Sequence, residues 1–79
     1  MNNKQLLNEL LCEFRVISGK IEKLLDYIAD NYNKLDKTTL SLLETQGCYM
    51  MKYRDILLLR MNTIKYGNES GDSNENIKW

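Results

Sequence analysis

A heptad pattern of apolar side chains runs through residues 3–30 and restricts what this part of the chain can form. The steps between the apolar residues alternate between three and four positions. The residues are Leu7, Leu10, Phe14, Ile17, Ile21, Leu24 and Ile28. This spacing places all of them on one stripe of an α-helix that packs lengthwise against another helix. The sequence therefore predicts a helix over residues 3–30.

A polar segment at residues 30–34 ends this pattern, because its Asp and Asn side chains compete for backbone hydrogen bonds. Asp36 is a typical helix N-cap and is preceded by an apolar residue. A second helix is expected over residues 37–66, where Gly67 can end it. Two helices with a short connection predict an all-α fold, in which residues 1–66 form an antiparallel hairpin.

The predicted second helix is apolar over a wide arc. Its centre line is Leu43, Met50, Leu57 and Ile64, and further apolar residues lie on both sides. At 100° per residue the arc spans about 220°, which is more than one partner helix covers. A monomeric hairpin would leave much of it in water, so we expect a homo-oligomer formed through this helix. Met50→Glu or Leu57→Glu is then expected to break the oligomer. Gly47 within the arc indicates either a close approach of helices or a tolerated weak point.

Composition excludes several kinds of chemistry. The chain of 79 residues has no His, so a His general base or a His metal ligand is absent, and its two Cys are too few for a zinc site. Its 11 basic residues balance its 11 acidic residues, which argues against a partner such as DNA or RNA. No apolar run approaches the roughly 20 residues of a membrane span. We expect a cytoplasmic protein that is not an enzyme and uses no cofactor or metal.

Residues 67–79 differ from the rest of the chain. They are polar and show no helical or strand periodicity of apolar residues, and the chain ends in Ile77-Lys78-Trp79. Such a composition predicts a flexible tail. Its last residues offer an apolar anchor for a partner protein.

Aromatic and basic residues in the predicted helices suggest a ligand site. Tyr49 and Tyr53 are four positions apart and can form one platform for a nucleotide base, while guanidinium groups bind phosphate through paired donors. The candidate ligand-binding residues are Arg15, Lys20, Tyr49, Tyr53, Arg54 and Arg60. The alternative is that the Tyr and Arg side chains pack in a helix interface, and that Arg15 and Lys20 belong to a solvated surface of mixed charge.

Short motifs follow one another in a fixed order over about two thirds of the chain. They are Arg15-Val16-Ile17, Lys20-Ile21-x-Lys23-Leu24, Asn33-Lys34-Leu35, Leu42-Leu43-x-x-Gln46 and Met50-x-x-Tyr53-x-x-Ile56-Leu57-x-x-Arg60. As a set they resemble a family of small helical-hairpin proteins of tailed bacteriophages, related to one first seen in a crAss-like phage. Gly19 and the tail ending in Trp79 depart from the family's pattern.

The resemblance implies a function through the shape of these proteins. They are similar to phage sponges, which are small, oligomeric and non-catalytic and trap cyclic nucleotides or NAD-derived signals of bacterial defence in basic pockets between subunits. The resemblance therefore implies an anti-defence protein in the cytoplasm of an infected bacterium. The alternative is a protein-binding module, either an inhibitor of a host protein or a phage accessory or structural protein.

Overall fold

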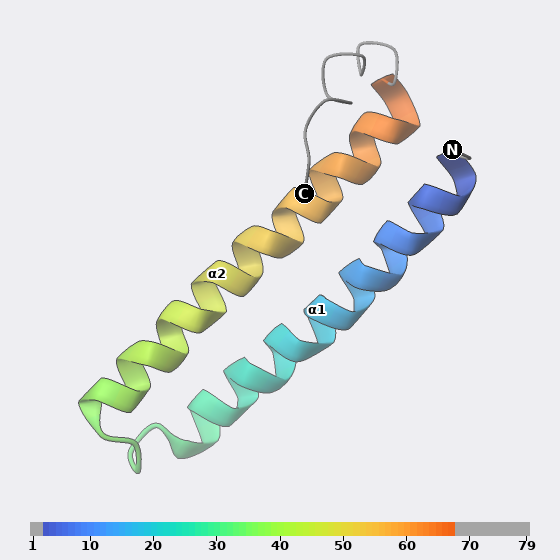
Figure 1. The fold of residues 1–79 in the computed structure, drawn as a ribbon. Helices are drawn as coiled ribbons and strands as arrows, with labels where there is room; N and C mark the ends of the chain where they lie inside the picture. Colours follow the sequence, from blue (N-terminus) through green and yellow to red (C-terminus); the bar gives the residue numbers. More distant parts are fainter. Residues whose placement is uncertain (1–2, 68–79) are drawn as a thin grey trace.

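The described part of the chain is helical except for the short connection at residues 32–36. The computed structural model describes residues 3–67, in which α1 is Asn3–Asn31, α2 is Lys37–Asn62 and η1 is a π-helix at Thr63–Gly67. Figure 1 shows α1 and α2 side by side and running in opposite directions, so that they form a hairpin. Residues 3–67 contain no strand, which confirms the all-α fold class. The tail expected over residues 67–79 lies outside the described residues from residue 68 onward.

Hydrogen bonds stabilise the C-terminal end of α1 and the N-terminal end of α2. The Asn31 carbonyl at the end of α1 accepts the backbone N–H groups of Lys34 and Leu35 at 2.8 and 3.1 Å. Asp36 is the N-cap of α2, and its Oδ1 accepts the Thr39 backbone N–H at 2.8 Å. These hydrogen bonds stabilise the charged carboxylate and lower the pKa of Asp36. The N-cap therefore lies where the sequence places it.

The C-terminal end of α2 differs from the expected regular helix up to residue 66. The α-helix ends at Asn62, and the chain continues as the π-helix η1. At this point the Thr63 hydroxyl donates to the Leu59 carbonyl at 2.9 Å, and the Thr63 backbone N–H bonds the carbonyls of both Leu59 and Arg60. The Leu59 carbonyl therefore accepts both the hydroxyl and the backbone N–H of Thr63, and the helix type changes at this residue.

The core lies between the helices, toward the end that carries the N-terminus of α1. Leu10, Leu57 and Met61 form a buried cluster, and Leu57 is fully buried at 0% exposure. Further apolar residues pack on this cluster, namely Leu6, Leu7, Phe14, Ile17 and Ile64. The heptad stripe of α1 therefore faces α2, as its period predicts.

Gly47 is buried at the side of α2 that faces α1. A Cβ at this position would lie 3.4 Å from Cδ2 of Leu24 in α1. An alanine methyl would therefore meet only the end of the Leu24 side chain, at van der Waals distance. Both interpretations of Gly47, a close approach and a tolerated weak point, stay predictions.

The wide apolar arc of α2 divides into a covered and an uncovered part. Its centre line packs toward α1, so that Leu57 is fully buried and Met50 is half-buried. On one flank, Leu42, Tyr49 and Ile56 remain 65%, 68% and 50% exposed. A Glu at position 57 would therefore damage the hairpin core itself before any contact between subunits. This flank is one apolar surface left for another molecule, and Leu58 and Leu59 are exposed elsewhere on the helix.

Candidate functional site

One broad side of the hairpin, here called the tyrosine face, gathers most of the candidate residues. From α2 it takes Leu42, Gln46, Tyr49, Tyr53, Ile56 and Arg60. These residues follow alternating steps of four and three, so they form a second heptad stripe beside the one that packs on α1. All but Arg60 are exposed, and Arg60 is half-buried.

A hydrogen bond between the helices identifies the part of α1 that borders this face. The Tyr53 hydroxyl donates to Oε2 of Glu13 at 2.6 Å. Residues spaced three, four or seven positions from Glu13 lie on the same flank of α1. This flank consists of Glu9, Glu13, Val16, Lys20, Lys23 and Tyr27, all of them exposed. The tyrosine face therefore has one edge from each helix.

The bond between Tyr53 and Glu13 also sets the electrostatics of the site. It raises the pKa of Tyr53 chiefly because the protonated phenol donates to the Glu13 carboxylate. Partial burial and the carboxylate charge raise this pKa further, whereas the charge of Arg60 lowers it. Arg60 is thus near enough to act on the phenol. The three side chains form one polar cluster in which an acid orients an aromatic ring.

We expect Glu13→Gln to lower the pKa of Tyr53 back toward the ordinary value of about 10, because the variant removes the carboxylate charge. The pKa of Tyr53 is raised in the folded protein. The bond therefore stabilises the hairpin fully at a pH below the ordinary pKa of tyrosine, and this stabilisation is lost as the pH rises through the raised pKa of Tyr53. The measurement is the ultraviolet absorbance titration of wild type minus that of Tyr53→Phe, repeated in the Glu13→Gln background. An unchanged Tyr53 titration would contradict the bond.

Two of the six candidate residues lie away from the tyrosine face. Arg54 is half-buried, and its Nε lies 3.8 Å from Oδ1 of the neighbouring Asp55. Arg15 is exposed and, by helical spacing, shares a flank of α1 with Leu11 and Glu22 rather than with Glu13. The structure therefore brings Lys20, Tyr49, Tyr53 and Arg60 to one face and leaves Arg15 and Arg54 outside it.

The four residues on the face do not meet at one point in a single chain. Glu13 lies opposite Tyr53, and because the helices are antiparallel, Lys20 is level with Gln46. From Gln46 to Arg60 the helix rises by about 21 Å at 1.5 Å per residue. One chain therefore presents a lysine end and a separate tyrosine–arginine end.

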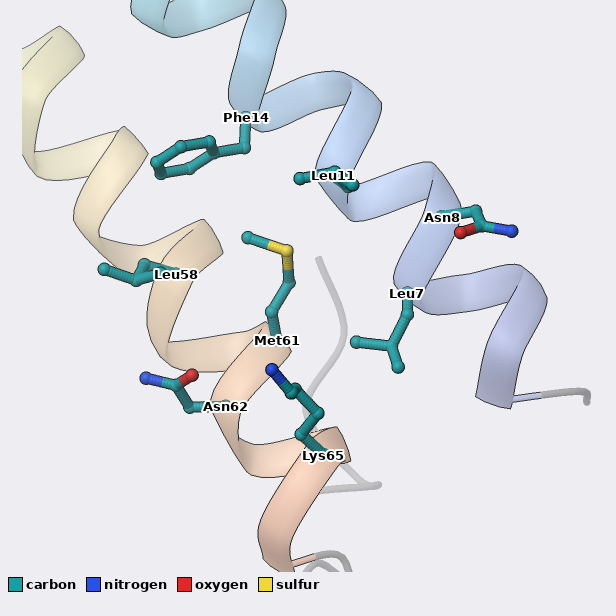
Figure 2. A pocket seen from close by; sticks show the side chains of 8 residues that line it. All are labelled: Leu7, Asn8, Leu11, Phe14, Leu58, Met61, Asn62 and Lys65. Carbon is teal, nitrogen blue, oxygen red and sulfur yellow. The ribbon is translucent and has the colours of Figure 1, made fainter.

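A groove near the chain's open end was not expected from the sequence. Figure 2 shows it between α1 on one side and α2 with η1 on the other. It has a volume of about 390 Å³ and is lined mainly by apolar atoms. The lining residues are Leu7, Asn8, Leu11, Phe14, Leu58, Met61, Asn62 and Lys65. None is a candidate ligand residue. Leu58 belongs to the predicted apolar arc, but helical periodicity alone does not show where two helix ends leave a hollow.

Other kinds of site find little support among residues 3–67. Within this range no group of three or more His, Cys, Asp or Glu side chains lies close enough together to hold a metal ion. Cys12 and Cys48 are free thiols and exposed. No helix in the described range has the length and apolar character needed to cross a bilayer. The candidate sites are thus the tyrosine face and the groove.

The fold and the tyrosine face together describe a small helical hairpin with an exposed surface suited to binding. Comparison with known families gives a match to the Sequestin family over residues 4–63, which includes both edges of the tyrosine face. The chain belongs to the Sequestin family, whose name is consistent with a protein that sequesters a molecule. No curated protein and no solved structure matches the chain.

Proposed function

We propose that this protein sequesters a phosphate-bearing nucleotide signal, either a cyclic oligonucleotide or an NAD-derived molecule, between the subunits of a homo-oligomer. The observation that carries the proposal is the tyrosine face, on which Tyr49, Tyr53, Lys20 and Arg60 accompany exposed apolar residues. Membership of the Sequestin family supports a role in holding a molecule rather than transforming it.

The chemistry of the face suits a nucleotide. An aromatic ring stacks a base for about 1–3 kcal/mol, and Tyr49 and Tyr53 offer two such rings one helical turn apart. The planar guanidinium of Arg60 matches a phosphate with two donors, and Lys20 adds a point charge. The Glu13 carboxylate accepts hydrogen bonds and holds the Tyr53 hydroxyl at 2.6 Å. It therefore favours a ligand that also carries hydroxyl or amino donors, as a nucleoside does.

The proposal extends to the setting in which the protein acts. We propose a bacteriophage anti-defence role in the cytoplasm of an infected bacterium, where captured signal no longer reaches its receptor. The protein works by binding and not as an enzyme, without a cofactor, a membrane or a nucleic acid polymer. In this proposal the ligand is bound by the four candidate residues on the tyrosine face. A ligand-binding role for Arg15 and Arg54 remains a prediction from the sequence.

The test is a thermal-shift panel of cyclic dinucleotides, cyclic trinucleotides and ADP-ribose derivatives. A ligand at 100 times its Kd stabilises the folded protein by about 2.7 kcal/mol, which raises the melting temperature. The captured molecule should be recovered unchanged after the protein is denatured, as mass spectrometry can show. A panel without any stabilising nucleotide would overturn the proposal, and a chemically altered ligand would overturn its non-catalytic part.

A protein-binding module is the second candidate, because the groove offers an apolar surface that no nucleotide needs. Its lining is mainly apolar, and Leu58 at its edge is exposed. An inhibitor of a host protein or a phage accessory or structural protein would use such a surface. This reading is favoured if no nucleotide binds and if a substitution in the groove abolishes the protein's biological effect while Arg60→Ala does not.

A further inference from the structure

We propose that the tyrosine face is covered by the same face of a second copy, turned end for end about a twofold axis that passes near Val16. The inference deepens the proposed function and rests on it for the ligand, since it brings Lys20 of one copy toward Arg60 of the other. The pairing of the two copies is argued from charge and apolar surface alone.

The charges along the α1 edge of the tyrosine face change sign at its middle. Glu9 and Glu13 lie on one side of Val16, and Lys20 and Lys23 lie on the other. All four charged side chains are exposed, and Val16 between them is 57% exposed. An edge with this polarity is complementary to itself when one copy is reversed. Val16 lies midway between the acidic and the basic pair and therefore at the axis.

Two twofold arrangements place this face against itself, and the charges favour one. If both copies point the same way, α1 lies over the partner's α2. Lys20 and Lys23 then meet the part of the partner's tyrosine face that carries Leu42 and Gln46 and no acid, since Glu44 lies on another side of α2. If the copies are reversed, α1 lies over the partner's α1. Glu13 and Glu9 then meet the partner's Lys20 and the partner's Lys23. Exposed ion pairs contribute little affinity, but their signs select the orientation of a complex.

The apolar residues of the face supply the driving force for this pairing. In the reversed arrangement the exposed Tyr49 lies near its own copy, and Leu42 lies over the partner's Ile56. The hairpin measures 50 × 20 × 16 Å, so one broad side offers on the order of 800 Å², the area per partner of a standard stable interface. Two α2 stripes with heptad spacing then pack against each other. The result is a four-helix arrangement with the tyrosine faces inside.

The reversed pairing also completes the candidate ligand site. Within one chain the levels of Lys20 and Arg60 are about 21 Å apart along the helices. With the axis at Val16, Tyr53 of the partner subunit is level with Lys20, and Arg60 of the partner subunit is about 9 Å further along. A nucleotide spans that distance. The twofold axis then creates two equivalent sites, each with lysine from one copy and tyrosine and arginine from the other.

Cysteine cross-linking tests the axis in nucleotide-free protein. In a background with Cys12→Ser and Cys48→Ser, Val16→Cys should form a covalent dimer on mild oxidation, because the two copies of this position face each other. Lys23→Cys alone should not cross-link, but a mixture of Lys23→Cys chains with Glu9→Cys chains should. If Val16→Cys cross-links no faster than Lys23→Cys, or if sedimentation at micromolar concentration shows only monomer, the proposal is wrong.

Charge reversal tests the orientation. We expect the double variant Glu9→Lys with Glu13→Lys to weaken dimerisation at least tenfold, because both pairs become repulsive. Adding Lys20→Glu and Lys23→Glu to the same chain should restore the dimer, because the reversed polarity is again complementary to itself. If this fourfold variant dimerises no better than the double variant, the end-for-end orientation is overturned.

A matched control and a binding measurement separate this inference from the proposed function. Glu22→Lys with Asp26→Lys makes the same change of charge on the flank and back of α1 away from the face, and it should leave the dimer intact. A dimer that passes these tests but binds no nucleotide leaves the pairing standing and removes the sponge. A monomer that binds nucleotide overturns the pairing and the placement of the ligand between subunits, but it leaves the sequestering role standing.

Discussion

Leu57→Ala should bring the free energy of unfolding close to zero at room temperature, because it removes the side chain on which the thin core depends. Leu57 is fully buried and packs with Leu10 and Met61. A buried Leu→Ala change costs about 2–5 kcal/mol, and a domain of this size rarely has more than about 3–5 kcal/mol of stability from a single core. Circular dichroism during thermal and urea denaturation measures the loss.

The matched control for this variant is two positions away on the same helix. Leu59 is 62% exposed, so Leu59→Ala makes the same chemical change at the surface and should alter the stability by less than about 0.5 kcal/mol. If the two variants are equally stable, the contact between α1 and α2 is not the main source of stability, and the assembly of subunits must supply it instead.

Arg60→Ala and Tyr53→Ala should each weaken nucleotide binding by roughly 10- to 100-fold. The estimate follows from about 1.5–3 kcal/mol for a charged hydrogen bond to phosphate and about 1–3 kcal/mol for stacking on an aromatic ring. Calorimetric titration with the nucleotide that binds best is the measurement. Binding to wild type should also weaken as salt is added, because the attraction depends on charge.

Two further variants distinguish a specific contact from a general change in charge. Arg60→Lys keeps the charge but loses the planar pair of donors, so its affinity should fall between those of wild type and Arg60→Ala. Lys37 is exposed at the start of α2 and has no three-, four- or seven-residue spacing to the tyrosine face, so Lys37→Ala should bind like wild type. If Arg60→Ala and Tyr53→Ala remain assembled and bind as tightly as wild type, these residues serve packing and the assigned site is wrong.

The all-helical fold could be predicted because it depends on local patterns. The heptad stripe identifies which side of α1 is apolar, and the Asp36 N-cap lies one residue before α2. The π-helix at Thr63–Gly67 could not be predicted in the same way. It begins at Thr63, whose hydroxyl bonds the Leu59 carbonyl, but Thr makes such a bond at many helical positions without a change of helix type.

The candidate site could be predicted only in part, because helical spacing does not give the level at which two helices pack. Spacing alone placed Tyr49, Tyr53 and Arg60 on one side of the second helix. It did not show that Glu13 reaches Tyr53, and so it did not show which flank of α1, that of Lys20 or that of Arg15, borders the tyrosine face. These relations depend on how the two helices are rotated against each other. In this hairpin they follow from the packing between the helices around Leu10, Leu57 and Met61.

The tyrosine face carries exposed apolar residues and four of the candidate ligand residues on the same surface, and this determines how capture depends on the amount of protein. If two copies must join to complete each site, only the joined form captures the ligand, and the apparent affinity rises with protein concentration. A cell that holds few copies would leave nearly all of the signal free. Capture would then begin steeply once synthesis passes the concentration at which pairs form, so the timing of expression would decide the outcome more than the strength of any single contact.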